Sequence, residues 1–208
     1  MTGVIVSDIL TLKKAIKLYF LVSIFYIAIG LFSGGGLNMI SFITFFGVML
    51  VFSSFSYNDL CHWDKFVNSA PVKRIDVVAA KYIFAVACIG ATVVIGMAVL
   101  AVSDLAAGEN MTEDIIGMGA VGAVGLIYCM VILPVLFKFG AEKARIILIV
   151  ILLAPVGIVM LLSKNTEFMN KLNSIDYEAL MIPGIAALIV LIALSFWISL
   201  AIYEKKEF

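Results

Sequence analysis

Long apolar runs, separated by short clusters of charged residues, dominate this sequence. The run from Leu18 to Asn58 contains no charged residue in 41 positions. As one helix it would be about 60 Å long, twice the roughly 30 Å that crosses the hydrocarbon of a bilayer. The pattern therefore predicts two spans, with a reversal at Ser33–Asn38, where three glycines accept turn dihedrals readily.

The other charge-poor runs extend this pattern along the rest of the chain. The predicted spans, six in total, cover residues 18–33, 38–57, 77–103, 115–137, 146–163 and 181–203. The expected fold class is an all-α integral membrane protein, a six-transmembrane-helix bundle. Residues 1–208 form a single transmembrane domain, because no loop is long enough to hold a second one.

The first residues show a different periodicity from the spans. Within residues 4–17, four apolar side chains recur at helical spacing, and the charged residues fall mostly on the other side; the apolar set is Ile5, Ile9, Leu12 and Ile16. This pattern predicts an N-terminal amphipathic helix lying at the cytoplasmic interface, with its lysines near anionic lipid headgroups. The alternative is the irregular start of a long first helix.

Composition supports a membrane location. Hydrophobic residues make up 64% of the 208 positions and charged residues only 13%, whereas a soluble domain is nearer half apolar. The N-terminal region has no pattern of a cleaved signal peptide, because charges precede the first span and no small-residue cleavage site follows it.

The distribution of basic residues predicts the orientation. Twelve of the 14 lie in four segments, residues 1–17, 57–81, 138–145 and 204–208, and only Lys164 and Lys171 lie in the opposite set. Cytoplasmic loops carry the excess of lysine and arginine. We therefore expect a multi-pass protein of the plasma membrane with both termini in the cytoplasm.

Motifs for catalysis are missing from the sequence. A single histidine, His62, cannot build a two-histidine metal site within one chain, and no phosphate-binding loop is present. We expect no catalytic, cofactor or metal residues, and no nucleic-acid partner. No ionisable residue lies in the middle of a predicted span, and Lys81 and Lys138 are expected to extend to the interface from the inner span ends.

One polar segment, Ser56–Tyr82, carries seven of the 28 charged residues. It reads as a short helix capped by Asn58 or Asp59 and ended by Pro71. Leu60, Trp63 and Val67 would share one face with Phe66 beside them, and the polar residues would face away, namely Asp59, His62, Lys65 and Asn68. One face would then rest on the bundle and the other would meet a cytoplasmic partner. A solvated loop that only obeys the positive-inside rule is the alternative.

The order of motifs in this segment resembles small permease subunits of bacterial ABC exporters, the type-2 membrane-component family. An acidic residue after the second span precedes a Trp-Asp-Lys-Phe element, then a Ser-x-Pro-x-x-Arg element and Lys-Tyr. Here these are Asp59, Trp63–Phe66, Ser69–Arg74 and Lys81-Tyr82. The usual leucine before the proline is Ala70 in this chain.

The resemblance implies a division of labour between subunits. A separate cytoplasmic ABC ATPase would bind ATP and Mg²⁺, and a second permease, identical or related, would complete the pathway. The segment around Asp59–Ser69 would be the coupling helix on the ATPase. The residues implied in coupling are Asp59, Leu60, Trp63, Asp64, Lys65, Phe66, Pro71 and Arg74. Exporters of amphipathic peptides, such as phenol-soluble modulins, and peptide-antibiotic resistance pumps are the kin it suggests.

Two other functions compete with transport. A membrane-embedded regulatory or assembly subunit would explain the short loops equally well, but not the motif order. An intramembrane enzyme is disfavoured by the missing catalytic motifs.

Overall fold

The computed structural model describes residues 2–33, 36–61, 63, 66–67, 73–107, 111–162 and 177–206. Within these ranges the regular elements are all helices, as the apolar runs predict. They are α1 (Thr2–Thr11), α2 (Lys13–Ser33), α3 (Gly36–Leu60), α5 (Arg74–Ala107), α6 (Met111–Leu162) and α8 (Tyr177–Glu204). A helix satisfies its own backbone hydrogen bonds, which an apolar segment requires inside lipid.

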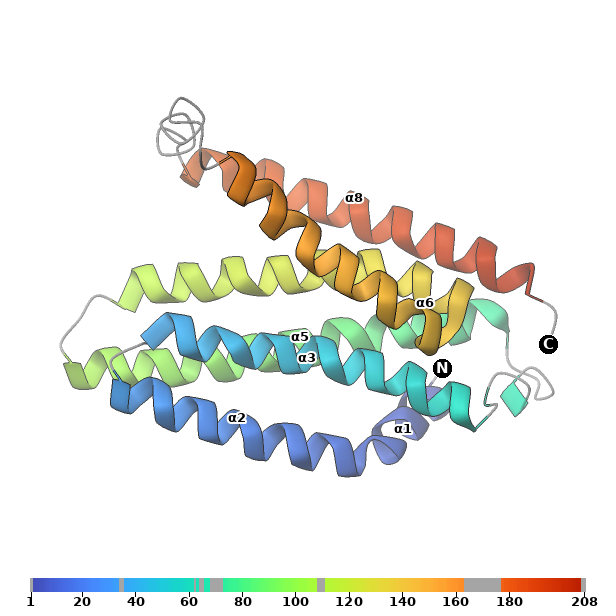
Figure 1. Cartoon of the computed structure of the whole chain (residues 1–208), viewed down its shortest axis with the longest axis horizontal. Coiled ribbons are helices and arrows are strands. Elements are labelled where there is room, and N and C mark those ends of the chain that lie inside the picture. The colour runs from blue at the N-terminus through green and yellow to red at the C-terminus, as the bar shows by residue number, and fades with distance from the viewer. Residues whose placement is uncertain are drawn as a thin grey trace.

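The longest element, α6, is two helices joined at a sharp bend. Gly140 has φ 73° and ψ 174°, a conformation that interrupts the helix and that favours glycine. The chain reverses direction there, so the two parts of α6 lie as a hairpin (Figure 1). Between the predicted spans 115–137 and 146–163 the chain therefore turns at a single glycine, within the basic segment 138–145.

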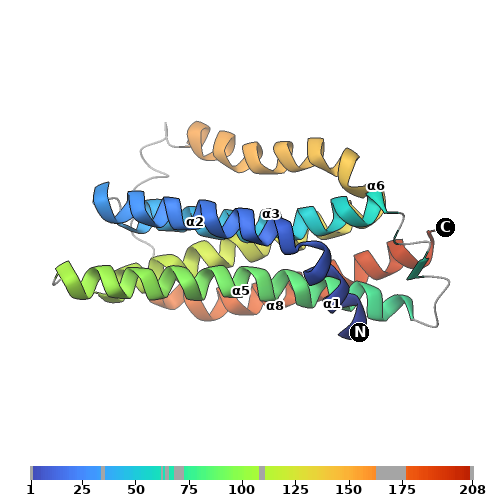
Figure 2. The same ribbon diagram turned by 90° about the horizontal axis from the view of Figure 1, so that it is seen from below.

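The helices run back and forth between two ends of an elongated bundle (Figures 1 and 2). α1, the end of α3, the start of α5, the bend of α6 and the end of α8 lie together at one end. We call this the N-terminal end of the bundle. α3 lies centrally and contacts α2, α5 and α6, while α8 packs against α6 and α5.

Four of the described helical segments are long and apolar enough to cross a membrane. They are Ile40–Leu60, Arg74–Leu105, Thr112–Ile151 and Pro183–Glu204. The third contains the Gly140 bend, and α2, with three lysines in its first five residues, is outside this set. The multi-pass membrane class is therefore confirmed, and the count of six spans stays a prediction.

Glycines allow close packing between α6 and its neighbours. A Cβ atom at Gly122 would lie 2.5 Å from Val93 Cγ2, and one at Gly125 would lie 2.9 Å from Thr44 Cγ2. The small residues of this region therefore face other helices of the same chain, which is how small residues usually act in membrane bundles.

The N-terminal helix differs from the predicted one. α1 is a separate helix that turns away from α2 at Leu12 (Figure 2). However, Asp8, which the predicted pattern places on the polar side, is buried in the bundle. The expected separation of apolar and charged sides is therefore wrong at Asp8. A position of α1 at the membrane interface stays a prediction.

Candidate coupling site at the N-terminal end of the bundle

Only some of the predicted coupling residues lie within the described ranges. Asp59, Leu60, Trp63, Phe66 and Arg74 are described, whereas Asp64, Lys65 and Pro71, like His62, lie outside. Asn58 and Asp59 belong to the last turns of α3, which continues to Leu60. The prediction that one of them caps a new helix is therefore wrong, because the helix of the second span continues past both.

The aromatic part of the segment divides into an inner and an outer side. Trp63 and Val67 are helical and pack on the main hydrophobic core, where Val67 is only 4% exposed. Leu60 and Phe66 are 75% and 65% exposed. Leu60 was expected on the inner face with Trp63, but it points outward because it still follows the register of α3.

Trp63 connects the segment to three other helices. With Phe55 of α3, Val77 of α5 and Phe137 of α6 it lines a cavity of about 10 Å³, room for roughly one water molecule. The Trp63 indole N–H is buried and has no hydrogen-bond partner among the described residues. Its ring also lies 5.4 Å from that of Phe66, so the outer side of the segment rests on this inner anchor.

Asp59 holds the bend of α6. Its Oδ2 accepts a hydrogen bond of 2.6 Å from the backbone N–H of Ala141. Ala141 is the first residue after Gly140, where the second part of α6 has unpaired N–H groups and a positive dipole end. Asp59 is thus an N-cap supplied from another helix, a role that no local sequence pattern indicates.

Arg74 binds the C-terminal end of α8. It is the first residue of α5, and its Nη1 donates hydrogen bonds to the backbone carbonyls of Tyr203 and Glu204. These are among the last carbonyls of α8, which basic side chains commonly satisfy. The guanidinium therefore ties the start of α5 to the end of α8.

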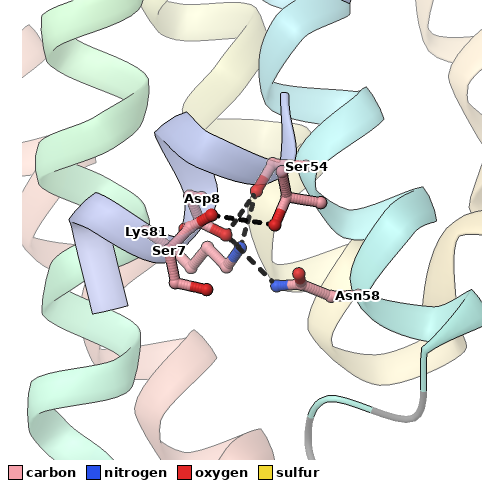
Figure 3. A network of polar contacts seen from close by, with 6 residues as sticks. Ser7, Asp8, Ser54, Asn58 and Lys81 are labelled. Carbon is pink, nitrogen blue, oxygen red and sulfur yellow. Dashed lines mark hydrogen bonds and ion pairs between the residues drawn. The ribbon is translucent and has the colours of Figure 1, made fainter. Parts of the chain in front are cut away.

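A buried ion pair connects α1 to the same region (Figure 3). Lys81 Nζ lies 2.7 Å from Asp8 Oδ1, and the two side chains are only 4% and 2% exposed. Lys81 also donates to Ser54 Oγ at 2.6 Å. The expectation that Lys81 extends to the interface is wrong, because a carboxylate on α1 meets it inside the bundle.

Two α3 side chains complete this ion pair. Ser54 Oγ and Asn58 Nδ2 donate to Asp8 Oδ1 at 3.1 and 3.4 Å. The other carboxylate oxygen, Oδ2, is buried with no partner among the described residues. Such a buried pair contributes little net stability, but removing one partner leaves an uncompensated charge in the interior.

This network could not be predicted from the sequence because its residues are far apart along the chain. Asp8 and Lys81 are 73 residues apart, and each has a simpler explanation in its own segment. The only available signal was Lys81 itself, a charge four residues inside the predicted third span. Tyr82, next to it, hydrogen-bonds Ser195 and Ser199 at 2.6 and 2.8 Å and so joins α5 to α8.

These contacts connect the end of α3 and the start of α5 with three other elements. Asp59 reaches the second part of α6, Arg74 reaches α8, and Lys81 reaches α1. The end of α3 and the start of α5, which flank the predicted coupling residues, are thus each tied by hydrogen bonds or an ion pair to other helices of the bundle.

Comparison with known proteins identifies the family. The sequence profile of the ABC-2 family transporter proteins matches residues 3–204, nearly the whole chain. The chain belongs to this family, and the resemblance inferred from residues 56–82 is confirmed. No curated protein and no solved structure matches it. The protein is thus a multi-pass membrane component of an ABC-2 type transporter, a permease subunit and not the catalytic one.

Proposed function

We propose that this chain is the permease subunit of an ATP-driven exporter in the plasma membrane of a bacterium. It moves an amphipathic or apolar cargo, an amphipathic peptide being the expected one, out of the cell. A separate cytoplasmic ATPase binds ATP and Mg²⁺ and supplies the energy. The family match over residues 3–204 carries this proposal.

The proposed topology has six spans, formed by α2, α3, α5, the two parts of α6, and α8. Both termini are cytoplasmic, together with the region around the α6 bend. The positions of α1 and of the end of α8 at one end of the bundle support this (Figure 1). So does the positive-inside count, because the three basic residues of 138–145 surround Gly140.

The coupling mechanism uses the contacts of the segment after α3. The ATPase docks on its outer side, where Leu60 and Phe66 are exposed, while Trp63 and Val67 hold its inner side on the bundle. ATPase closure displaces the segment and with it the end of α3 and the start of α5, whose links to α6, α8 and α1 transmit this as rigid-body movement of two permease subunits. The docking surface must differ between two states for such coupling to occur.

The alternative function is a membrane-embedded regulatory or assembly subunit of a larger complex. It would use the same docking side without moving cargo. Transport of cargo into vesicles by the reconstituted complex separates the two, because a regulatory subunit would support ATPase binding alone.

The decisive experiment measures co-purification of the ATPase encoded by a neighbouring gene, together with cargo-stimulated ATP hydrolysis. Trp63→Ala removes the aromatic anchor that holds the segment on the bundle, and loss of a core-packed tryptophan side chain costs about 3–5 kcal/mol. We expect the variant to insert normally but to lose the ATPase or its coupling. Full assembly and full activity of Trp63→Ala would contradict the proposed coupling segment.

A second pair of variants separates the two roles of Asp59. Asp59→Asn removes the charge but keeps an oxygen that caps Ala141 N–H, because asparagine caps nearly as well as aspartate. We expect Asp59→Asn to weaken ATPase association in a salt-dependent manner at unchanged thermal stability. Asp59→Ala loses the cap as well and should also melt earlier. Equal association of wild type and Asp59→Asn at all salt concentrations would remove Asp59 from the docking surface.

Topology is tested by labelling single cysteines in intact cells with an impermeant reagent. Lys73→Cys and Thr112→Cys, both at exposed positions, are introduced in a Cys61→Ser background. We expect labelling at Thr112→Cys only. Labelling at Lys73→Cys in intact cells would invert the proposed orientation.

A further inference from the structure

A groove separates the second part of α6 from α2 and α3. In Figure 2 this part of α6 lies beside α3 at the edge of the bundle. The groove consists of two adjoining pockets of about 440 and 530 Å³ that share Ser56, Leu60 and Arg145. Volumes of this size are typical of small-molecule sites.

The two pockets differ in chemistry. The first has apolar walls from Met49, Phe52 and Leu148, with hydroxyls from Tyr19 and Ser53. The second lies around the α6 bend, where Lys138, Lys143, Arg145 and Lys206 outnumber Asp59 and Glu142. The carboxylate of Asp59 is already engaged with the N–H of Ala141, and the excess of two basic side chains leaves this end net positive.

Arg145 lies where the two pockets meet. It is exposed and its guanidinium carbon is 5.9 Å from the centre of the Phe52 ring, within the range of a cation–π contact. The groove therefore runs from its basic end at the α6 bend, past Arg145, to the apolar pocket along α3.

We propose that this groove binds an anionic amphiphile of lipid type. Its anionic group contacts Lys138, Lys143 and Arg145, and its hydrocarbon chain lies along Met49, Phe52 and Leu148. Basic pockets between membrane helices at the cytoplasmic side bind anionic headgroups for the same electrostatic reason. The site goes beyond the proposed export function, and only its cytoplasmic orientation rests on the proposed topology.

The test uses the purified full chain in phosphatidylcholine nanodiscs, without any ATPase, so its failure leaves the export proposal untouched. The probe is a photoactivatable palmitate, compared with the corresponding alcohol, and labelled peptides are mapped by mass spectrometry. We expect palmitate, and not the alcohol, to label residues 49–60 and the start of the second part of α6. Equal labelling by both probes would overturn the proposal. So would the absence of labelling in the groove, as expected if a second copy of the chain covers it.

Matched variants test the basic end. Lys143→Gln/Arg145→Gln should reduce labelling about tenfold or more, because both basic side chains attract the anionic group. Lys13→Gln/Lys14→Gln removes the same charge from the exposed start of α2 and should leave labelling unchanged. Ser56→Trp, which fills the shared wall without changing charge, should also abolish labelling. Wild-type labelling in Lys143→Gln/Arg145→Gln or in Ser56→Trp would contradict the site.

A final arm identifies the source of the ligand. Phosphatidylglycerol is added to the nanodisc as a competitor. Displacement of palmitate by this lipid assigns the site to an anionic lipid of the bilayer. Retention of palmitate labelling assigns it to a free single-chain amphiphile. Either result supports the shared chemistry of an anionic group and an apolar chain.

Discussion

The two parts of α6 have similar apolar sequences and very different surroundings. The first part is central, with Met118, Met130 and Leu133 fully buried. In the second part, Ile146, Ile149 and Val150 are more than half exposed. Glycines explain much of the difference, because Gly122 and Gly125 let α5 and α3 approach the first part closely. Hydropathy thus predicts entry into the membrane, and side-chain size decides which helices become the core.

The largest effect is expected from breaking the buried ion pair between Asp8 of α1 and Lys81 of α5. Lys81→Met leaves the Asp8 carboxylate buried without its cation, which costs about 3–5 kcal/mol. We expect a large fall in the thermal unfolding midpoint in detergent. The double variant Asp8→Leu/Lys81→Met should recover much of the loss, and Lys73→Met, an exposed residue, should have little effect. A single variant as stable as wild type would mean that Asp8 and Lys81 do not pair.

Overpacking the first part of α6 comes next. Gly122→Leu places a side chain against Val93, and overpacking of this kind costs about 1–3 kcal/mol. The control is Gly90→Leu, because a Cβ there meets no atom within 4 Å. Thermal unfolding of both variants measures the contrast. Equal stability of the two would show that the α5–α6 contact is looser than described.

The bend between the two parts should be about as sensitive. At Gly140, φ of 73° with ψ of 174° is a backbone conformation that is essentially restricted to glycine and costs other residues about 1–3 kcal/mol, and a Cβ would lie 3.0 Å from Asp59 Oδ2. Gly140→Ala should therefore lower the unfolding midpoint, whereas Gly184→Ala, in open surroundings, should not. An unchanged midpoint for Gly140→Ala would argue for a different turn.

The smallest effect is expected at the contact between the two parts. The Tyr128 hydroxyl donates to the Leu148 carbonyl at 3.1 Å, and such bonds in membrane bundles average about 0.6 kcal/mol. Tyr128→Phe should shift the unfolding midpoint only slightly. A loss as large as that of Gly122→Leu would show that the second part of α6 is held as firmly as the first.

The sequence was sufficient for the class of fold and insufficient for its internal contacts. Charge-free runs located the long helices, because burial of backbone groups in lipid leaves little choice of structure, and the spacing of apolar residues located α1. Trp63 and Val67 were correctly placed on the inner side by helical spacing. Leu60 was not, because the end of α3 depends on tertiary contacts. The Asp8–Lys81 pair and the Asp59 cap join distant segments, which no local periodicity reports.

The pairing of Asp8 with Lys81 also has a consequence for biosynthesis. Lys81 follows Asp8 by 73 residues, so at about 5–20 residues per second it leaves the ribosome some seconds later. Throughout that interval Asp8 lacks the cation that it meets in the folded bundle. The contact of α1 with α5 therefore forms only after the start of α5 has been synthesised.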